Sequence, residues 1–114
     1  MERFATLSGE RVESWRRRLD EHASKGETVA LWGAGARGVG FLNLADPNET
    51  IRHVVDINPR KDGLHVAGTG QRIAKPESLR GVDPKIVVIM NPNYRQEIED
   101  SLRELGLDSE VVLA

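Results

Sequence analysis

The feature that most constrains the fold is a short apolar strand pattern that runs directly into three spaced glycines. Thr28–Trp32 is apolar and rich in strand-forming residues. Gly33, Gly35 and Gly38 follow at G-x-G-x-x-G spacing and open a predicted helix. In this context the first glycine permits a tight turn, the second lets a phosphate approach the backbone, and the third lets helix and strand pack closely. The helix start favours an anion, so the turn predicts a nucleotide or phosphate site.

Asp56 is a second indication of nucleotide binding. It ends a second predicted strand, Ile51–Val55, and follows Gly33 by 23 positions. This is close to the ~20-residue offset of the acid that holds ribose hydroxyls in dinucleotide sites. The alternative interpretation is that the glycines only form a turn and that Asp56 caps a loop. The sequence leaves both interpretations open.

Other candidate residues lie in the glycine turn itself or after the carboxyl ends of predicted strands. Arg37, inside the glycine turn, either pairs with a phosphate or points to solvent. Asn58 and Lys61 belong to the polar turn after the second strand, where Lys61 either reaches a second phosphate or is solvated. Asn91 and Tyr94 either line the pocket or serve as a cap and a core aromatic. The predicted nucleotide-binding set is Gly33, Gly35, Arg37, Gly38, Asp56, Asn58, Lys61, Asn91 and Tyr94.

The remaining segments continue an alternation of helix and strand patterns. A helix is predicted over residues 9–25, and a last helix after a capping box formed by Asn93 and Gln96. Ile86–Met90 is the most apolar run and predicts a central parallel strand beside the strand that precedes the glycines. We therefore expect one small Rossmann-like three-layer α/β domain over residues 1–114, with a mostly parallel sheet of four to five strands.

Composition narrows the function classes. The 114-residue chain has no cysteine, which excludes disulfides, thiolate metal sites and a cysteine nucleophile. Its formal net charge of -2 gives no drive toward nucleic acid or anionic membranes. The three histidines share no metal-ligand spacing. No apolar run approaches the ~20 residues of a membrane span, and the N-terminus has no apolar signal core. We expect a cytoplasmic domain that holds no metal.

Four segments in order resemble a known family. They are VALWGAGARGVGFLNL, VVDINPRKDGLHVAGTGQRI, KPESL and VVIMNPNYRQEI, within a likeness that runs from about Val12 to Val112. The combination resembles the C-terminal domain of bacterial SAM-dependent C-methyltransferases, which include enzymes that methylate nucleotide-linked deoxysugars. A looser likeness is to the N-terminal nucleotide-sugar-binding domain of bacterial sugar acyltransferases.

The resemblance implies a role inside a larger enzyme. Family members have a cysteine-rich zinc-binding segment, a SAM-binding catalytic domain, and this Rossmann-like domain, which helps to hold the nucleotide-linked sugar. The present chain has neither the zinc cysteines nor a second glycine-rich unit for SAM. No catalytic residue is therefore carried over, and this domain alone is expected to bind no cofactor. The implied partners are a nucleotide-linked sugar and a SAM-binding catalytic domain, in cis or in trans. The chain is either an excised domain or a stand-alone homologue.

Two other functions fit the residues. The first is a regulatory or redox module that binds NAD, in which Asp56 would hold an adenosine ribose. The chain is short for a dehydrogenase and shows no acid–base pair of its own. The second is an interaction module that works through its N-terminal helix and whose glycine turn is vestigial.

Overall fold

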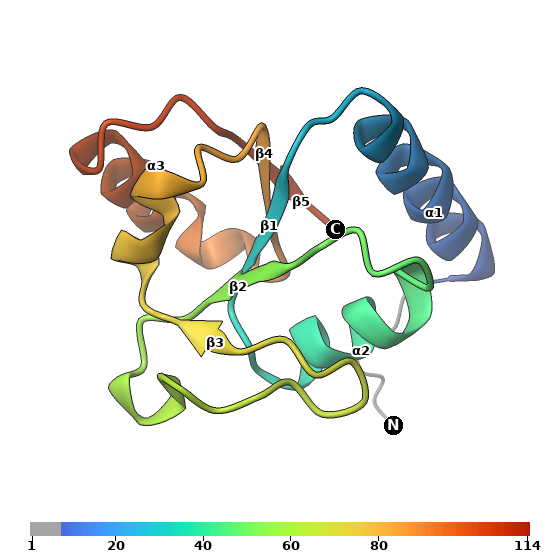
Figure 1. The fold of residues 1–114 in the computed structure, drawn as a ribbon, viewed down its shortest axis with the longest axis horizontal. Helices are drawn as coiled ribbons and strands as arrows, with labels where there is room; N and C mark the ends of the chain where they lie inside the picture. Colours follow the sequence, from blue (N-terminus) through green and yellow to red (C-terminus); the bar gives the residue numbers. More distant parts are fainter. Residues whose placement is uncertain (1–7) are drawn as a thin grey trace.

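A single five-stranded sheet forms the centre of the domain. The computed structural model describes residues 8–114, and residues 1–7 lie outside the described part. The strands, all parallel, have the order β3-β2-β1-β4-β5 (Figure 1). They are β1 (Val29–Trp32), β2 (His53–Val55), β3 (Ile73–Ala74), β4 (Ile86–Ile89) and β5 (Glu110–Leu113). The expected α/β domain with a parallel sheet is confirmed.

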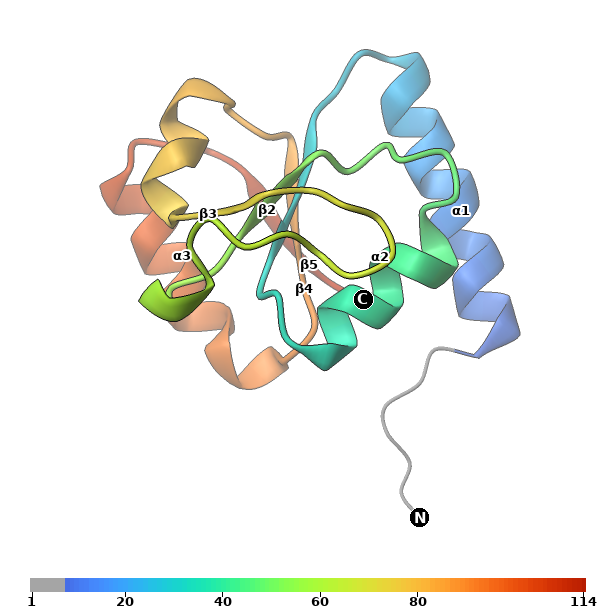
Figure 2. The ribbon, with the colours of Figure 1, turned by 60° about the horizontal axis from the view of Figure 1, so that its bottom comes forward.

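Helices cover both faces of the sheet, as Figure 2 shows. Helices α1 (Gly9–Ser24) and α2 (Ala36–Ala45) lie on one face, and α1 contacts α2. Helix α3 (Arg95–Glu104) and the 3-10 helix η2 (Pro76–Gly81) cover the other face. This arrangement follows from right-handed crossovers, because the chain moves one way from β1 to β3 and then crosses to β4 on the opposite side.

The two central strands are buried on both faces. All four residues of β1 and all four of β4 are buried, and Trp32 lies level with Ile89 in the β1–β4 pairing. A strand covered by helices on both faces needs apolar side chains at every position. The predicted adjacency of these two runs at the centre of the sheet is therefore confirmed.

Two separate cores lie on the two sides of the sheet. The core beneath α1 and α2 contains Trp15 and Phe41, whose rings meet edge to face with centroids 5.3 Å apart. The core beneath α3 and η2 contains Trp32, Leu79 and Leu102. The two tryptophans therefore occupy opposite faces of the sheet.

The first helix has the ends that its sequence predicts. The Ser8 side chain accepts a hydrogen bond from the Arg11 N–H at 3.2 Å and so caps α1. The chain leaves α1 at Gly26, which has a φ of 71°, a conformation that costs glycine little.

The start of the last helix differs from the prediction. Pro92 begins a short 3-10 turn, η3 (Pro92–Tyr94), and the Asn91 side chain caps this turn by accepting from the Asn93 N–H at 2.9 Å. Helix α3 then begins at Arg95 without a side-chain cap, so the capping box of Asn93 with Gln96 does not form. A proline favours the first position of such a turn because its φ is fixed, and the turn shifts the start of α3.

Candidate functional site

The glycine turn connects β1 to α2 at the carboxyl edge of the sheet. Gly33 has a φ of 113°, and its N–H donates to the Val55 carbonyl at 2.7 Å. A Cβ on Gly38 would lie 2.2 Å from the Gly33 carbonyl oxygen, so this helix position requires glycine. Gly35 caps α2 in an extended conformation and supplies no side-chain hydrogen bond. The first turn of α2 therefore presents its N–H groups without a side-chain cap.

Asp56 ties this turn to the end of β2. One carboxylate oxygen accepts from the Ala34 N–H at 2.8 Å, and the other accepts from the Asn58 N–H at 2.9 Å. The Asn58 side chain in turn accepts from the Arg60 N–H and caps the 3-10 helix η1 (Pro59–Lys61). Asp56 thus has the loop-capping contacts of the alternative interpretation. A carboxylate has about four acceptor positions, so these two bonds leave acceptor capacity for ribose hydroxyls.

Two basic residues flank the turn. The Lys61 ammonium donates to the Ala34 carbonyl at 3.2 Å, which places a positive charge beside the turn. Arg37 is exposed at the second position of α2. Within residues 8–114, the Arg37 side chain forms no ion pair. The structure therefore brings Gly33, Asp56, Asn58 and Lys61 together around one turn, with Arg37 at its rim.

Asn91 and Tyr94 follow the neighbouring strand. Because Trp32 pairs with Ile89, the residues after β4 leave the sheet at the same edge as the glycine turn. Tyr94 is 53% exposed, so its expected alternative role as a core aromatic is wrong. Strand order reverses between β1 and β4, which is where open α/β sheets bind ligands.

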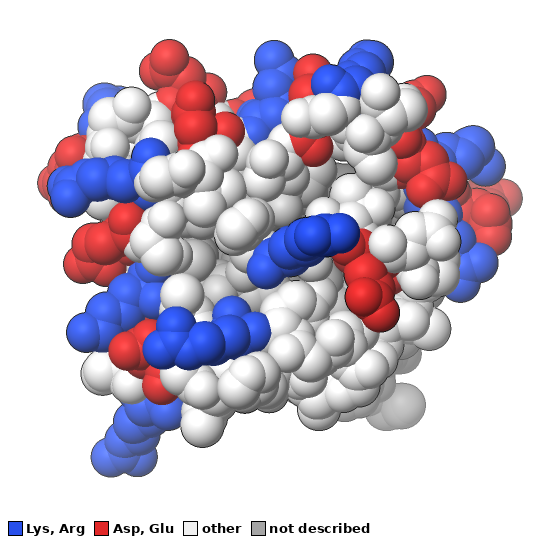
Figure 3. All heavy atoms as spheres, viewed as in Figure 1, with Lys and Arg blue, Asp and Glu red and all other residues white. Residues whose placement is uncertain are grey.

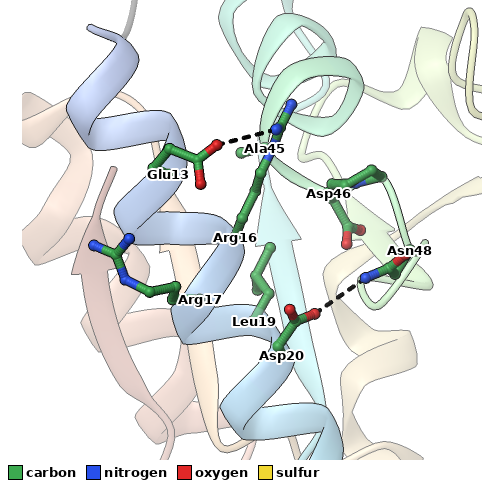
Figure 4. A pocket seen from close by; sticks show the side chains of 9 residues that line it. Glu13, Arg16, Arg17, Leu19, Asp20, Ala45, Asp46 and Asn48 are labelled. Carbon is green, nitrogen blue, oxygen red and sulfur yellow. Dashed lines mark hydrogen bonds and ion pairs between the residues drawn. The ribbon is translucent and has the colours of Figure 1, made fainter.

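Away from the glycine turn, a hollow lies between α1 and the segment after α2. It has a volume of about 210 Å³ and is drawn in Figure 4. The Arg16 guanidinium donates to the Leu44 carbonyl at 2.9 and 3.2 Å, and Asn48 donates to Asp20 at 3.1 Å. These contacts join α1 to the end of α2, so the polar groups serve packing of the two helices.

Asp46 is the buried carboxyl group beside this hollow. It is 4% exposed, and its two oxygens accept from the N–H groups of Thr50 and Ile51, both at 2.8 Å. Burial raises the pKa of Asp46, and the two backbone hydrogen bonds oppose that rise. Asp46 therefore shapes the turn from α2 to β2.

A larger groove opens on the other face of the sheet, at a place where the sequence predicts no site. It has a volume of about 440 Å³ and lies between η2 and the end of α3. Trp32 and Ile57 line it, as do Lys75, Ser101 and Leu105. The one signal in the sequence is Ile57, an apolar residue directly after Asp56 in a polar turn, and its side chain is 73% exposed.

The electrostatic character of the surface is mixed. Acidic and basic side chains are interspersed on the face drawn in Figure 3, near its middle as well as along its margins. No group of three or more potential metal ligands occurs in the described residues 8–114. None of the helices in that range is long and apolar enough to cross a membrane.

Solved structures with a similar fold include three of the Rex-family repressor RSP. The repressor RSP matches with a TM-score of 0.58 and 17% identity, over 90% of this chain and 60% of that one. RSP in complex with beta-NAD+ and operator DNA matches with a TM-score of 0.56 and 19% identity, over 90% and 57%. RSP in complex with beta-NADH matches with a TM-score of 0.57 and 13% identity, over 97% of this chain and 89% of that one. The chain thus spans about 60% of the length of the first of these structures, and likeness at this identity shows the fold.

Sequence comparison is more specific. No curated protein sequence matches the chain. The sequence pattern of one family, described as the C-methyltransferase C-terminal domain, matches residues 2–110. This range includes the glycine turn, Asp56, and the segment after β4, all of which carry the resemblance noted in the sequence. The chain therefore belongs to the C-methyltransferase C-terminal domain family.

Proposed function

We propose that this domain binds a nucleotide-linked sugar and presents it to a SAM-binding catalytic domain. The observation that carries the proposal is the uncapped start of α2 at the carboxyl edge, with Lys61 beside it. N–H groups and a helix dipole favour an anion at this place, and the diphosphate of a nucleotide-linked sugar supplies one.

Different residues around the turn bind different parts of the ligand in this proposal. The diphosphate lies against the backbone from Gly35 to Gly38, where Arg37 adds a positive charge at the rim. Asp56 accepts from the ribose hydroxyls with the lone pairs that its two backbone bonds leave unused. Asn91 and Tyr94, at the end of the adjacent strand, lie where the sugar would leave the domain toward its reaction partner.

SAM belongs to the partner domain in this proposal. SAM supplies the methyl group; its one anionic group is the carboxylate of its methionine part, and it has no diphosphate to lie along the start of α2. The chain's own residues bind and orient the sugar substrate and transfer no methyl group. The partner is a catalytic domain in cis or in trans, and we place the protein in the cytoplasm, where activated sugars and SAM are both present.

Parallel calorimetric titrations of the 114-residue protein with a nucleotide-linked sugar, NAD and SAM test the proposal. Binding of the sugar nucleotide alone supports it. Arg37→Ala should weaken that binding by ~1–3 kcal/mol if the guanidinium pairs with the diphosphate. Arg17→Ala, which removes an exposed arginine from α1, is the matched control and should change nothing. Binding of SAM instead of the sugar nucleotide would reject the proposal.

A second candidate function is a regulatory or redox module that binds NAD. The observation in its favour is the fold shared with repressor structures solved with beta-NAD+ and with beta-NADH. NAD also carries a diphosphate and a ribose, so the same residues suit it. Tight binding of NAD together with no binding of a nucleotide-linked sugar would favour this function.

A further inference from the structure

We propose that the groove between η2 and α3 holds the base of the bound nucleotide. This inference rests on the proposed function, because it assigns the part of the ligand that the glycine turn and Asp56 do not reach. The groove volume of about 440 Å³ lies within the range of small-molecule pockets, roughly 300–1,000 Å³. It is more than twice the hollow beside α1, of about 210 Å³, whose polar groups are engaged in joining two helices.

The groove adjoins the nucleotide site through two pairs of neighbours along the chain. Trp32, which lines the groove, directly precedes Gly33 of the turn. Ile57, also a lining residue, directly follows Asp56. A phosphate at the turn and a ribose at Asp56 therefore bring the attached base to the mouth of this groove.

The order of the strands also supports a nucleotide that extends from the glycine turn toward the groove. Across the carboxyl edge, β1, β2 and β3 lie side by side, and the Asp56 N–H donates to the Ala74 carbonyl at 3.1 Å. Lys75, the residue after β3, lines the groove. A nucleotide that runs from the glycine turn past Asp56 thus continues toward Lys75 and the start of η2.

The lining has the chemistry that a base requires. Ile57 presents an aliphatic side chain that is 73% exposed, so a flat ring packed on it would remove apolar surface from water. Half of the lining residues are charged or polar and add hydrogen-bonding groups: Lys75, Glu77, Arg80, Ser101 and Glu104. Apolar surface for the ring and polar groups for its edge are what a site for a heterocycle combines, and this groove supplies both.

Binding by nucleoside diphosphates with different bases tests the inference, with ribose 5-phosphate and pyrophosphate as probes that lack a base. Ile57→Ser should weaken binding of the preferred nucleoside diphosphate roughly tenfold, the size of effect that lost apolar contact in a pocket produces. Its effect on ribose 5-phosphate and pyrophosphate should be below twofold. Ile57→Leu should restore the affinity. Leu64→Ser is the matched control, because Leu64 is 55% exposed in the same connection and does not line the groove.

Tryptophan NMR signals give a measurement that is independent of affinity. The indole N–H signal of Trp32 should shift on addition of a nucleoside diphosphate and stay in place with pyrophosphate. Trp15, on the opposite face of the sheet, serves as the internal reference.

The possible failures are distinguishable. If nucleoside diphosphates bind and Arg37→Ala weakens them, but Ile57→Ser and the Trp32 signal show no response, the proposed function stands and the base site is overturned. If no nucleoside diphosphate binds at all, the proposed function and the base site both fail. A groove that binds an apolar side chain of another domain would give a Trp32 shift only on addition of that domain, and that result also overturns the base site.

Discussion

The Asp56 carboxylate accepts a hydrogen bond from the Ala34 N–H at 2.8 Å, across the gap between the ends of β1 and β2. Its other oxygen accepts from the Asn58 N–H at 2.9 Å. One side chain therefore fixes the shape of the glycine turn and of the loop after β2. The acid expected to hold ribose also builds the surface on which a nucleotide would lie.

Asp56→Ala should reduce both stability and nucleotide affinity. The buried Ala34 N–H loses its acceptor in this variant. An unsatisfied buried donor costs ~1–3 kcal/mol of unfolding free energy, measurable by urea denaturation. Calorimetric titration should show a further loss of ~1.5–3 kcal/mol in binding. Lowered stability with unchanged affinity would make Asp56 purely structural.

Gly38→Ala should destabilise the domain through a clash at the turn. The new Cβ would lie 2.2 Å from the Gly33 carbonyl oxygen, a backbone atom that cannot rotate away. Forced overpacking of this kind costs ~1–3 kcal/mol. Gly40→Ala is the matched control in the same helix, because its Cβ meets nothing within 4 Å. It should stabilise the domain by ~0.5–1 kcal/mol. Equal thermal stability of the two variants would contradict the predicted packing role of Gly38.

The sequence predicts those parts of the fold in which a short run of residues is compatible with only one local structure. The runs at β1 and β4 are apolar at every position because both faces of each strand are covered. The glycine turn is recognisable because the backbone at Gly33 has a positive φ and position 38 has no space for a Cβ atom. These constraints act within a few residues, so the sequence displays them.

The parts that could not be predicted depend on distant segments. The groove combines Trp32, Ile57, Lys75 and Ser101, which come from four separate elements or loops. The bond from Ala34 to Asp56 likewise joins residues that only sheet pairing brings together. The start of α3 was misplaced because the 3-10 turn beginning at Pro92 competes with the capping box, and local patterns do not decide between the two.

Asp46 should make stability fall as pH rises through the acid range. Burial raises the pKa of Asp46 in the folded protein above its ordinary value of 3.8. The folded state then binds more protons than the unfolded state between these two pKa values, so stability decreases with rising pH across that window. In Asp46→Asn the side chain at this position has no titratable group. The unfolding free energy of the wild type minus that of this variant should therefore decline as the pH rises from about 3.

The difference in unfolding free energy between the wild type and Asp46→Asn isolates the contribution of Asp46. A hydrogen bond from His22 lowers the pKa of Glu27, and hydrogen bonds from Arg103 and Gln96 lower the pKa of Asp100. Both groups therefore contribute stability that is lost as pH falls, which is the opposite slope. They are present in both proteins and cancel in the comparison. A difference that is flat from pH 3 to 7 would show that Asp46 keeps its ordinary pKa.

Gly35→Val should abolish anion binding while the domain still folds. Gly35 has a φ of -78° and a ψ of -174°, which a β-branched residue adopts readily, and a Cβ there would meet nothing within 4 Å. The loss of a favourable N-cap residue should cost no more than ~1 kcal/mol of stability. The added methyl groups would instead occupy the space in which a phosphate meets the first N–H groups of α2. Titration with a nucleoside diphosphate measures this, and Gly35→Ala should give an intermediate loss. A variant that folds and binds the diphosphate like the wild type would show that the turn is an ordinary strand–helix connection.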